Sequence, residues 1–215
     1  MRKLYYSLGS PFARKVRIVL AEKGLEYEKD ELNNQIRPIA EFSSVNPNLQ
    51  VPVLEDGEMR LFESNLIVEY LLKTYPDAPA GTPEPPLATT MTRPDRHWED
   101  AKILATLETM ANSIVNLRLM MGEGLKVEDV IYLQRQQSRV QLCLDWLEQR
   151  AEKEGFAPGW FSIMDINLIC PLQFSDARGG IIEWRGRPKL EAISANYQQR
   201  PSIQTTAPNP APVAL

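Results

Sequence analysis

A proline-rich segment divides the chain into two stretches with different hydrophobic patterns. Residues 76–94, PDAPAGTPEPPLATTMTRP, contain six prolines and one glycine, a composition that favours an extended, semi-rigid linker. The length of 215 residues allows two small domains. We therefore predict a first domain over 1–76, a linker over 77–94, a helical domain over 95–200 and a proline-rich tail over 201–215.

The stretch before the linker alternates between strand and helix signals. Ser10-Pro11 is a typical helix start, because Ser is a preferred N-cap and Pro is favoured at the first helical position. Asp56-Gly57 lies between two short apolar runs and predicts a β-hairpin. The pattern predicts an α/β domain with a mixed sheet. Its elements are strands at 2–8, 26–32 and either side of 56–57, with helices from Ser10 to Gly24, near 37–43 and from Ser64 to Tyr75.

The stretch after the linker has apolar residues at helical spacing, which predicts an all-α bundle. Ser162 and Asp165 have the spacing of a capping box, with Asp replacing the usual Glu or Gln at the third position. A last short helix is predicted over 188–198. The tail 201–215 carries no charged side chains and four prolines, so we expect it to be extended and loosely packed, or disordered.

Composition excludes several classes of function. The net charge is −4, which leaves no basic surplus for a nucleic-acid backbone. No apolar run approaches the roughly 18 residues of a membrane helix, and the N-terminus does not have the pattern of a signal peptide. We expect a cytoplasmic protein. The chain has one histidine, His97, and two cysteines, Cys143 and Cys170. A multi-histidine metal site is therefore excluded, and reduced, buried thiols are expected.

Four segments in order resemble the cytosolic glutathione transferases of bacterial type, over nearly the whole chain. They are KLYYSLGSPFARKVRIVLAEKGLEYE, NPNLQVPVLEDGEMRLFESNLIVEYL, FSIMDINL and RPSIQTTAP. The resemblance is to the serine-type members. It implies an α/β thioredoxin-like N-terminal domain, an all-α helical-bundle C-terminal domain and a homodimer. It further implies glutathione as co-substrate, and in view of the single histidine we expect no metal.

The resemblance also assigns roles in glutathione binding. Val51-Pro52 matches a position where the family has a cis peptide bond, and there Val51 pairs its backbone with the cysteinyl unit of glutathione. Glu63 matches the partner of the ammonium group, and Ser64 matches the N-cap that receives the γ-glutamyl carboxylate. Gln50 stands where many relatives have a Lys for the glycyl carboxylate. It brings no charge, so Gln35 or Arg37 is an alternative anchor. Read alone, these residues also fit an ordinary X-Pro bond and a capping serine beside a solvated acid.

Ser10 matches the hydroxyl that donates a hydrogen bond to the glutathione sulfur, although a simple N-cap explains it equally well. The helix start reads Ser10-Pro11-Phe12-Ala13 and lacks the Cys-x-x-Cys of redox relatives, so any thiol chemistry must use bound glutathione. Arg14 is interpreted as structural or solvated, with contact to the sulfur or to an acidic substrate as the alternative. The electrophile is expected in an apolar cleft between the domains, with Leu8 and Phe12 at its floor.

Three functions stay open at this point. The first is conjugation of glutathione to a small hydrophobic electrophile, which rests on Ser10 and the glutathione anchors. The second is another reaction at the same site, such as disulfide reduction, dehalogenation or isomerisation. The third is a non-catalytic interaction protein that keeps the fold.

Overall fold

The computed structural model describes residues 1–32, 42–77, 79 and 81–208. The chain forms two compact units that do not follow sequence order. Unit 1 contains Met1–Pro83, Thr89–Met91 and Arg200–Asn209, and unit 2 contains most of the intervening chain, Glu84–Ala88 and Thr92–Gln199. The helix predicted near 37–43 falls largely outside the described residues.

Unit 1 is built on a four-stranded mixed sheet with the order β2-β1-β3-β4. β1 (Arg2–Tyr6) runs parallel to β2 (Glu28–Glu31) and antiparallel to β3 (Val53–Asp56), which pairs with β4 (Met59–Phe62). The parallel pair needs a crossover, and α1 (Pro11–Glu22) supplies it. The predicted hairpin at Asp56-Gly57 is confirmed, since β3 and β4 pair across it.

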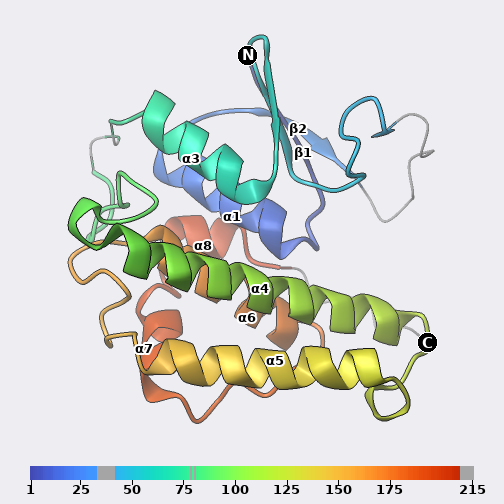
Figure 1. Cartoon of the computed structure of the whole chain (residues 1–215). Helices are drawn as coiled ribbons and strands as arrows, with labels where there is room; N and C mark the ends of the chain where they lie inside the picture. Colours follow the sequence, from blue (N-terminus) through green and yellow to red (C-terminus); the bar gives the residue numbers. More distant parts are fainter. Residues whose placement is uncertain (33–41, 78, 80, 209–215) are drawn as a thin grey trace. The chain divides into compact units, whose positions relative to one another are not determined.

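Two helices pack together in unit 1, as Figure 1 shows: α1 and α3 (Ser64–Thr74). α1 buries a nearly continuous apolar face that includes Val16, Val19 and Leu20, all fully buried. Gly24 follows the helix with a φ of 60°, the left-handed conformation that glycine adopts at low cost after a helix. Leu4 and Leu54 from the central strands complete the core.

The C-terminal stretch differs from its prediction. Residues Pro201–Thr205 form a short helix, α8, which packs on α1 (Figure 1). Ser202 and Ile203 are buried there, and so the expectation of a loose or disordered tail is wrong for the described residues up to 208. Ion pairing and apolar burial against α1 explain the difference, because neither is visible in the composition of the tail.

Unit 2 consists of helices, as predicted. α4 (His97–Gly122) packs against α5 (Ile131–Glu148) and α6 (Ile163–Asp176), and α7 (Pro188–Asn196) packs against both α5 and α6. Short 3₁₀ turns precede α4 and α5, at η1 (Pro94–Arg96) and η2 (Val127–Asp129). Nearly every residue of α6 is buried, which makes it the central helix of the unit.

The predicted capping box at the start of α6 is confirmed. The Ser162 hydroxyl accepts a hydrogen bond from the Asp165 amide at 3.1 Å, and the Asp165 carboxylate accepts from the Ser162 amide at 2.9 Å. The same carboxylate accepts from the amide of Phe156 at 2.9 Å. Asp165 therefore caps the helix and also fixes the loop before it.

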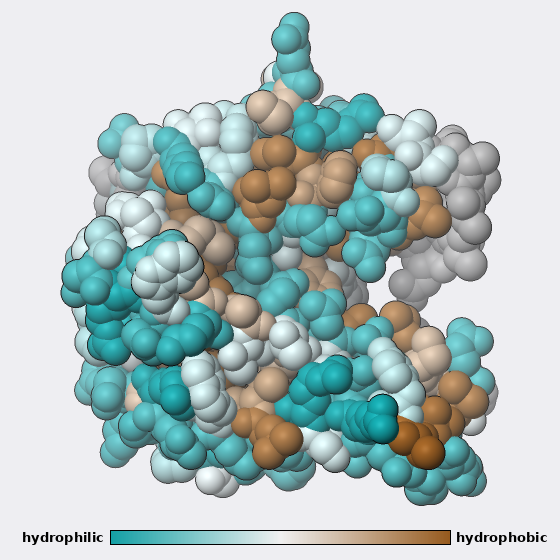
Figure 2. Space-filling model, viewed as in Figure 1, coloured by the Kyte–Doolittle hydropathy of each residue, from teal (hydrophilic) through white to brown (hydrophobic). Residues whose placement is uncertain are grey.

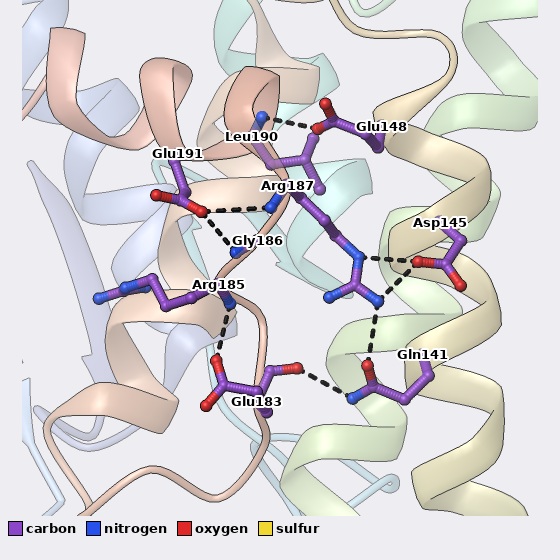
Figure 3. Close-up of polar contacts among 9 residues, drawn as sticks. All are labelled: Gln141, Asp145, Glu148, Glu183, Arg185, Gly186, Arg187, Leu190 and Glu191. Carbon is purple, nitrogen blue, oxygen red and sulfur yellow. Dashed lines mark hydrogen bonds and ion pairs between the residues drawn. The ribbon is translucent and has the colours of Figure 1, made fainter.

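A polar network joins the loop before α7 to α5 (Figure 3). Arg187 contacts the Asp145 carboxylate through Nε at 2.9 Å and through Nη2 at 2.6 Å. Glu148 accepts hydrogen bonds from the amides of Lys189 and Leu190, both at 3.1 Å. These amides are at the start of α7 and have no partner within the helix, so a carboxylate from α5 takes the place of a cap.

Candidate functional site

Val51 presents an unused backbone edge in unit 1. The Val51–Pro52 peptide bond is cis. Pro52 is buried and Val51 packs beside a cluster of Tyr5, Phe42 and Val53. Within the described residues, neither the N–H nor the C=O of Val51 forms a hydrogen bond. A half-buried backbone with both groups free is suited to pairing with an extended peptide.

The loop before Val51 is ordered by the side chain of Asn46, which is 1% exposed. Its Nδ2 donates to the Gln50 carbonyl at 2.7 Å, and its Oδ1 accepts from the Asn48 amide at 2.9 Å. Leu49 within this loop has a φ of 55°, a left-handed conformation that costs a non-glycine residue energy. The loop is thus held in one shape that ends at Val51. The Gln50 side chain is exposed beside it.

Glu63 and Ser64 lie at the start of α3, with one correction to the prediction. The N-cap is Glu63, with φ 70° and ψ 113°, and Ser64 is the first helical residue. The sequence placed the cap one residue late, because Ser is the better capping residue and nothing local indicates a positive φ at Glu63. Within the described chain, neither the hydroxyl nor the amide of Ser64 has a hydrogen-bond partner. An anion at this end of α3 would meet free donors and the helix dipole.

Ser10 has the geometry of an N-cap that keeps a free donor. Its Oγ accepts a hydrogen bond from the Ala13 amide at 3.2 Å, and its own amide donates to the Ser7 carbonyl at 3.1 Å. A hydroxyl has one hydrogen to donate and two lone pairs that accept. Capping uses one lone pair and leaves the O–H available, so the two readings of Ser10 are compatible. Ser10 is half-buried, as are Leu8 and Phe12.

Arg14 and Lys15 are both buried and tie α1 to other parts of unit 1. Arg14 is 1% exposed and donates from Nη2 to the Ile203 carbonyl at 3.1 Å and from Nε to the Thr206 hydroxyl at 3.4 Å. This favours the structural interpretation of Arg14 over a contact with the sulfur. Lys15 donates from Nζ to Asn65 Oδ1 at 2.7 Å, which connects the helix of Ser10 to the helix of Ser64.

The remaining predictions concern the alternative glycyl anchors, metal ligands, membrane helices and the two cysteines. Gln35 and Arg37 lie outside the described residues. In the part of the chain that the structure describes, no group of three or more His, Cys, Asp or Glu side chains is placed to hold a metal ion. No described helix is both long enough and apolar enough to cross a membrane. Cys170 is buried as expected, whereas Cys143 on α5 is only half-buried, and desolvation raises the pKa of its thiol.

The sequence patterns do not indicate a role for Asn46 and Asn48 at the site. The proline within the run Asn46-Pro47-Asn48 indicates only irregular chain there. Asn side chains often bond to backbone two residues further on, and this pattern was the available signal. The hydrogen bond from Asn48 Nδ2 to Glu63 Oε1, 3.0 Å long, joins positions 15 residues apart and has no local signal.

The mixed sheet with α1 and α3 in one unit and the α-helical bundle in the other define the glutathione transferase fold. Residues 4–83 match the family of glutathione S-transferase N-terminal domains. A crystal structure of a glutathione S-transferase from Methylobacillus flagellatus KT, with glutathione bound, aligns with a TM-score of 0.79 and 27% identity. The alignment covers 97% of this chain and 100% of that one.

Curated relatives align with the chain over different lengths. The uncharacterized GST-like protein YibF of Escherichia coli is 29% identical over 215 residues, with 96% of this chain and 98% of the relative covered. A stringent starvation protein A homologue of Haemophilus ducreyi is 38% identical over 92 residues, which are 40% of this chain and 42% of the relative. Glutathione S-transferase F14 of Arabidopsis thaliana is 27% identical, over 71% of this chain and 61% of its own length. These likenesses support the glutathione S-transferase family.

Proposed function

We propose that the chain is a serine-type glutathione transferase that conjugates glutathione to a small hydrophobic electrophile. The observation that carries this proposal is the free backbone of Val51, whose N–H and C=O bond to no described residue. Glutathione is a tripeptide, and its cysteinyl unit offers one N–H and one C=O of its own. Pairing these groups with Val51 extends the backbone pairing of unit 1 by one short segment.

The start of α3 offers matching anchors for the γ-glutamyl end. Its carboxylate takes the free amide and hydroxyl of Ser64, and its ammonium takes the carboxylate of Glu63. Glu63 is exposed and, among the described residues, forms no ion pair, so its charge is available to a ligand. At the other end, Gln50 hydrogen bonds to the glycyl carboxylate without a charge.

Ser10 supplies the step that makes the thiol reactive. Its O–H donates to the sulfur and, with the N-terminal end of α1, stabilises the thiolate. Lowering a thiol pKa by two units requires about 2.7 kcal/mol, and a charge-assisted hydrogen bond contributes roughly 1.5–3 kcal/mol. The proton leaves to solvent. The sulfur lone pair then attacks the electrophilic carbon, and the leaving group departs with its bonding electrons.

Two measurements test this proposal in order. Calorimetric titration of the full chain with glutathione tests the binding site, and no binding at millimolar concentration would overturn it. Replacement of Ser10 by Ala tests the chemistry: conjugation of an aryl halide should fall by one to three orders of magnitude while glutathione affinity is kept, consistent with the loss of one oriented donor. Unchanged turnover in this variant would remove Ser10 from the mechanism.

The two other functions are separated by different assays. A glutathione-dependent reductase would turn over a mixed disulfide of glutathione faster than an aryl halide. The interaction protein would bind no glutathione and would be recovered with RNA polymerase in a pull-down. The similarity to stringent starvation protein A homologues is the observation that keeps the interaction protein as a candidate.

We further propose a cytoplasmic homodimer. Large apolar side chains are exposed on both units, among them Leu66 on α3 and Trp98 on α4, at 49% and 77% exposure. Figure 2 shows apolar groups gathered over the connection between α4 and α5, where Leu119 and Ile131 are 55% and 68% exposed. Exposed apolar area of this kind is typical of an interface. Light scattering of the purified chain should give a mass near twice 24.4 kDa, and a mass of one chain at micromolar concentration would contradict the dimer.

A further inference from the structure

The loop that ends at Val51 also contacts the carboxylate of Glu63. Asn48 Nδ2 lies 3.0 Å from Glu63 Oε1. Because an ionised carboxylate can only accept hydrogen bonds, the donating NH₂ of Asn48 is the group that faces it. Only one of the two carboxylate oxygens is used in this contact, and no other side chain of the described chain hydrogen bonds to Glu63. One oxygen therefore stays open toward a ligand.

Asn48 is itself held in place from the core side. Its amide donates to Asn46 Oδ1 at 2.9 Å, and Asn46 is almost fully buried. The backbone of Asn46 is fixed in turn, because its backbone N–H donates to the Phe42 carbonyl at 2.9 Å. A buried side chain whose NH₂ and carbonyl groups are both hydrogen bonded is a rigid support. Asn46 therefore restricts the position of Asn48, and Asn48 restricts the position of the Glu63 carboxylate.

Glu63 benefits from such a support, because its uncommon backbone conformation does not by itself fix the direction of the side chain. The residue has φ 70°, a backbone conformation that is uncommon for residues other than glycine, and its side chain is exposed. An exposed Glu loses rotamer freedom when it binds a cation, and this loss lowers affinity. A hydrogen bond that already restricts the side chain reduces that cost.

We propose that Asn48 is a positioning residue that orients the Glu63 carboxylate toward the ammonium group of a γ-glutamyl ligand. This inference rests on the proposed function, since it assumes that glutathione binds at the start of α3. Asn48 does not touch the ligand in this arrangement. It acts through Glu63, so its effect depends on a ligand that carries the ammonium group.

The test compares two ligands by calorimetric titration of the full chain. The first is glutathione, and the second is glutaryl-cysteinyl-glycine, which is glutathione without its α-amino group. Asn48→Ala removes the donor, and Asn48→Leu removes it while keeping the bulk of the side chain. Both variants should raise the Kd for glutathione about three- to tenfold, the range of one net hydrogen bond. Neither should change the Kd for the amine-free analogue by more than about twofold.

Two controls separate positioning from a general weakening of the loop. Asn112→Ala removes an exposed amide on α4 that donates to the Glu108 carbonyl, and it should leave both affinities unchanged. In a Glu63→Gln background, Asn48→Ala should add no further loss, because the two residues act as one unit. Melting temperatures of all variants report whether the fold is kept.

The outcomes distinguish the two proposals. If the unaltered chain binds no glutathione, the proposed function fails and this inference fails with it. If the unaltered chain binds and Glu63→Gln weakens binding, but Asn48→Ala and Asn48→Leu have no effect, only the inference is overturned. Equal loss of affinity for both ligands also overturns it, since a structural defect of the loop would not discriminate between them.

Discussion

Arg200 and Glu22 form a buried, two-pronged ion pair between residues 178 positions apart in sequence. Nε and Nη2 of Arg200 donate to the two carboxylate oxygens of Glu22, each at 2.7 Å. The two side chains are 3% and 2% exposed, and the Ser202 hydroxyl also donates to Glu22. This pair holds the segment that begins at Arg200 against the end of α1.

Removing one partner of this pair should destabilise unit 1 strongly. Arg200→Met leaves the Glu22 carboxylate buried without its cation, which typically costs 3–5 kcal/mol, roughly. Urea unfolding followed by far-ultraviolet circular dichroism measures the loss. The double variant Glu22→Leu with Arg200→Met should recover much of it, because no charge then remains buried. Lys102→Ala, which breaks an exposed pair with Glu99, is the control and should have little effect. Equal stability of Arg200→Met and the unaltered chain would contradict the argument.

Stability should depend on pH through Asp165. Complete burial raises the pKa of this carboxyl from 3.8 to about 6, and hydrogen bonds from Phe156 and Ser162 oppose the rise. Between these values the folded chain binds more protons than the unfolded chain. The contribution of Asp165 to the free energy of unfolding is therefore fully present below pH 3.8 and is lost as the pH rises through about 6. Two pKa units correspond to about 3 kcal/mol.

This dependence is checked by chemical unfolding at pH values from 4 to 7. Asp165→Asn should flatten the part of the curve that falls between pH 4 and 6, at a cost in overall stability from the weakened capping box. Asp129→Asn, at an exposed position in the same unit, should leave the slope as it is. A slope that survives Asp165→Asn would assign it to another group.

Gly155 should tolerate no side chain, because a Cβ there would lie 3.0 Å and 3.1 Å from the two carboxylate oxygens of Asp165. Its φ of 137° adds backbone strain for any other residue. Gly159→Ala is the matched control, with φ 87° and no atom within 4 Å of the added carbon. Thermal unfolding should show a larger drop for Gly155→Ala than for Gly159→Ala. Equal drops would mean that backbone strain alone decides the result.

Replacing Leu49 by Gly should stabilise unit 1, since Leu49 has φ 55° and a side chain that is 45% exposed. Relief of the left-handed conformation is expected to contribute about 1 kcal/mol. Gly57→Ala, at φ 63° with open space around the added carbon, should cost a similar amount, about 1 kcal/mol. Opposite shifts in the urea midpoint of the two variants check the argument. A lower midpoint for Leu49→Gly would show that the exposed leucine contributes more by contact than it costs in strain.

Local signals in the sequence predicted the local parts of this structure. The hairpin at Asp56-Gly57 and the capping box of Ser162 and Asp165 each need only a few neighbouring residues, and both are confirmed. The start of α3 was misplaced by one residue, because the positive φ of Glu63 depends on its surroundings rather than on its own preference. Distant contacts had no signal: the tail offers no composition that points to Glu22, and nothing near Asn48 points to Glu63.

The candidate site also contains residues that the sequence indicates and contacts that only the structure shows. Val51, Ser64 and Ser10 were selected by family resemblance, and the structure adds free backbone, amide and hydroxyl groups at these positions. Arg14 illustrates the limit of the pattern. Its position one turn after Ser10 allowed a role at the sulfur, but burial against Ile203 and Thr206 directs its guanidinium elsewhere. Which neighbour a buried cation meets is decided by the fold as a whole.

The return of residues 200–209 to unit 1 sets the order in which a growing chain can acquire its structure on the ribosome. β1 and α1 are made first, yet the surface of α1 that carries Arg14 and Glu22 stays uncovered until Arg200 to Thr206 have been translated. All of α4 to α7 is synthesised in between. Domains usually fold in the order of their synthesis, but here unit 1, which contains the first residues of the chain, is completed only after the helices of unit 2 have been synthesised.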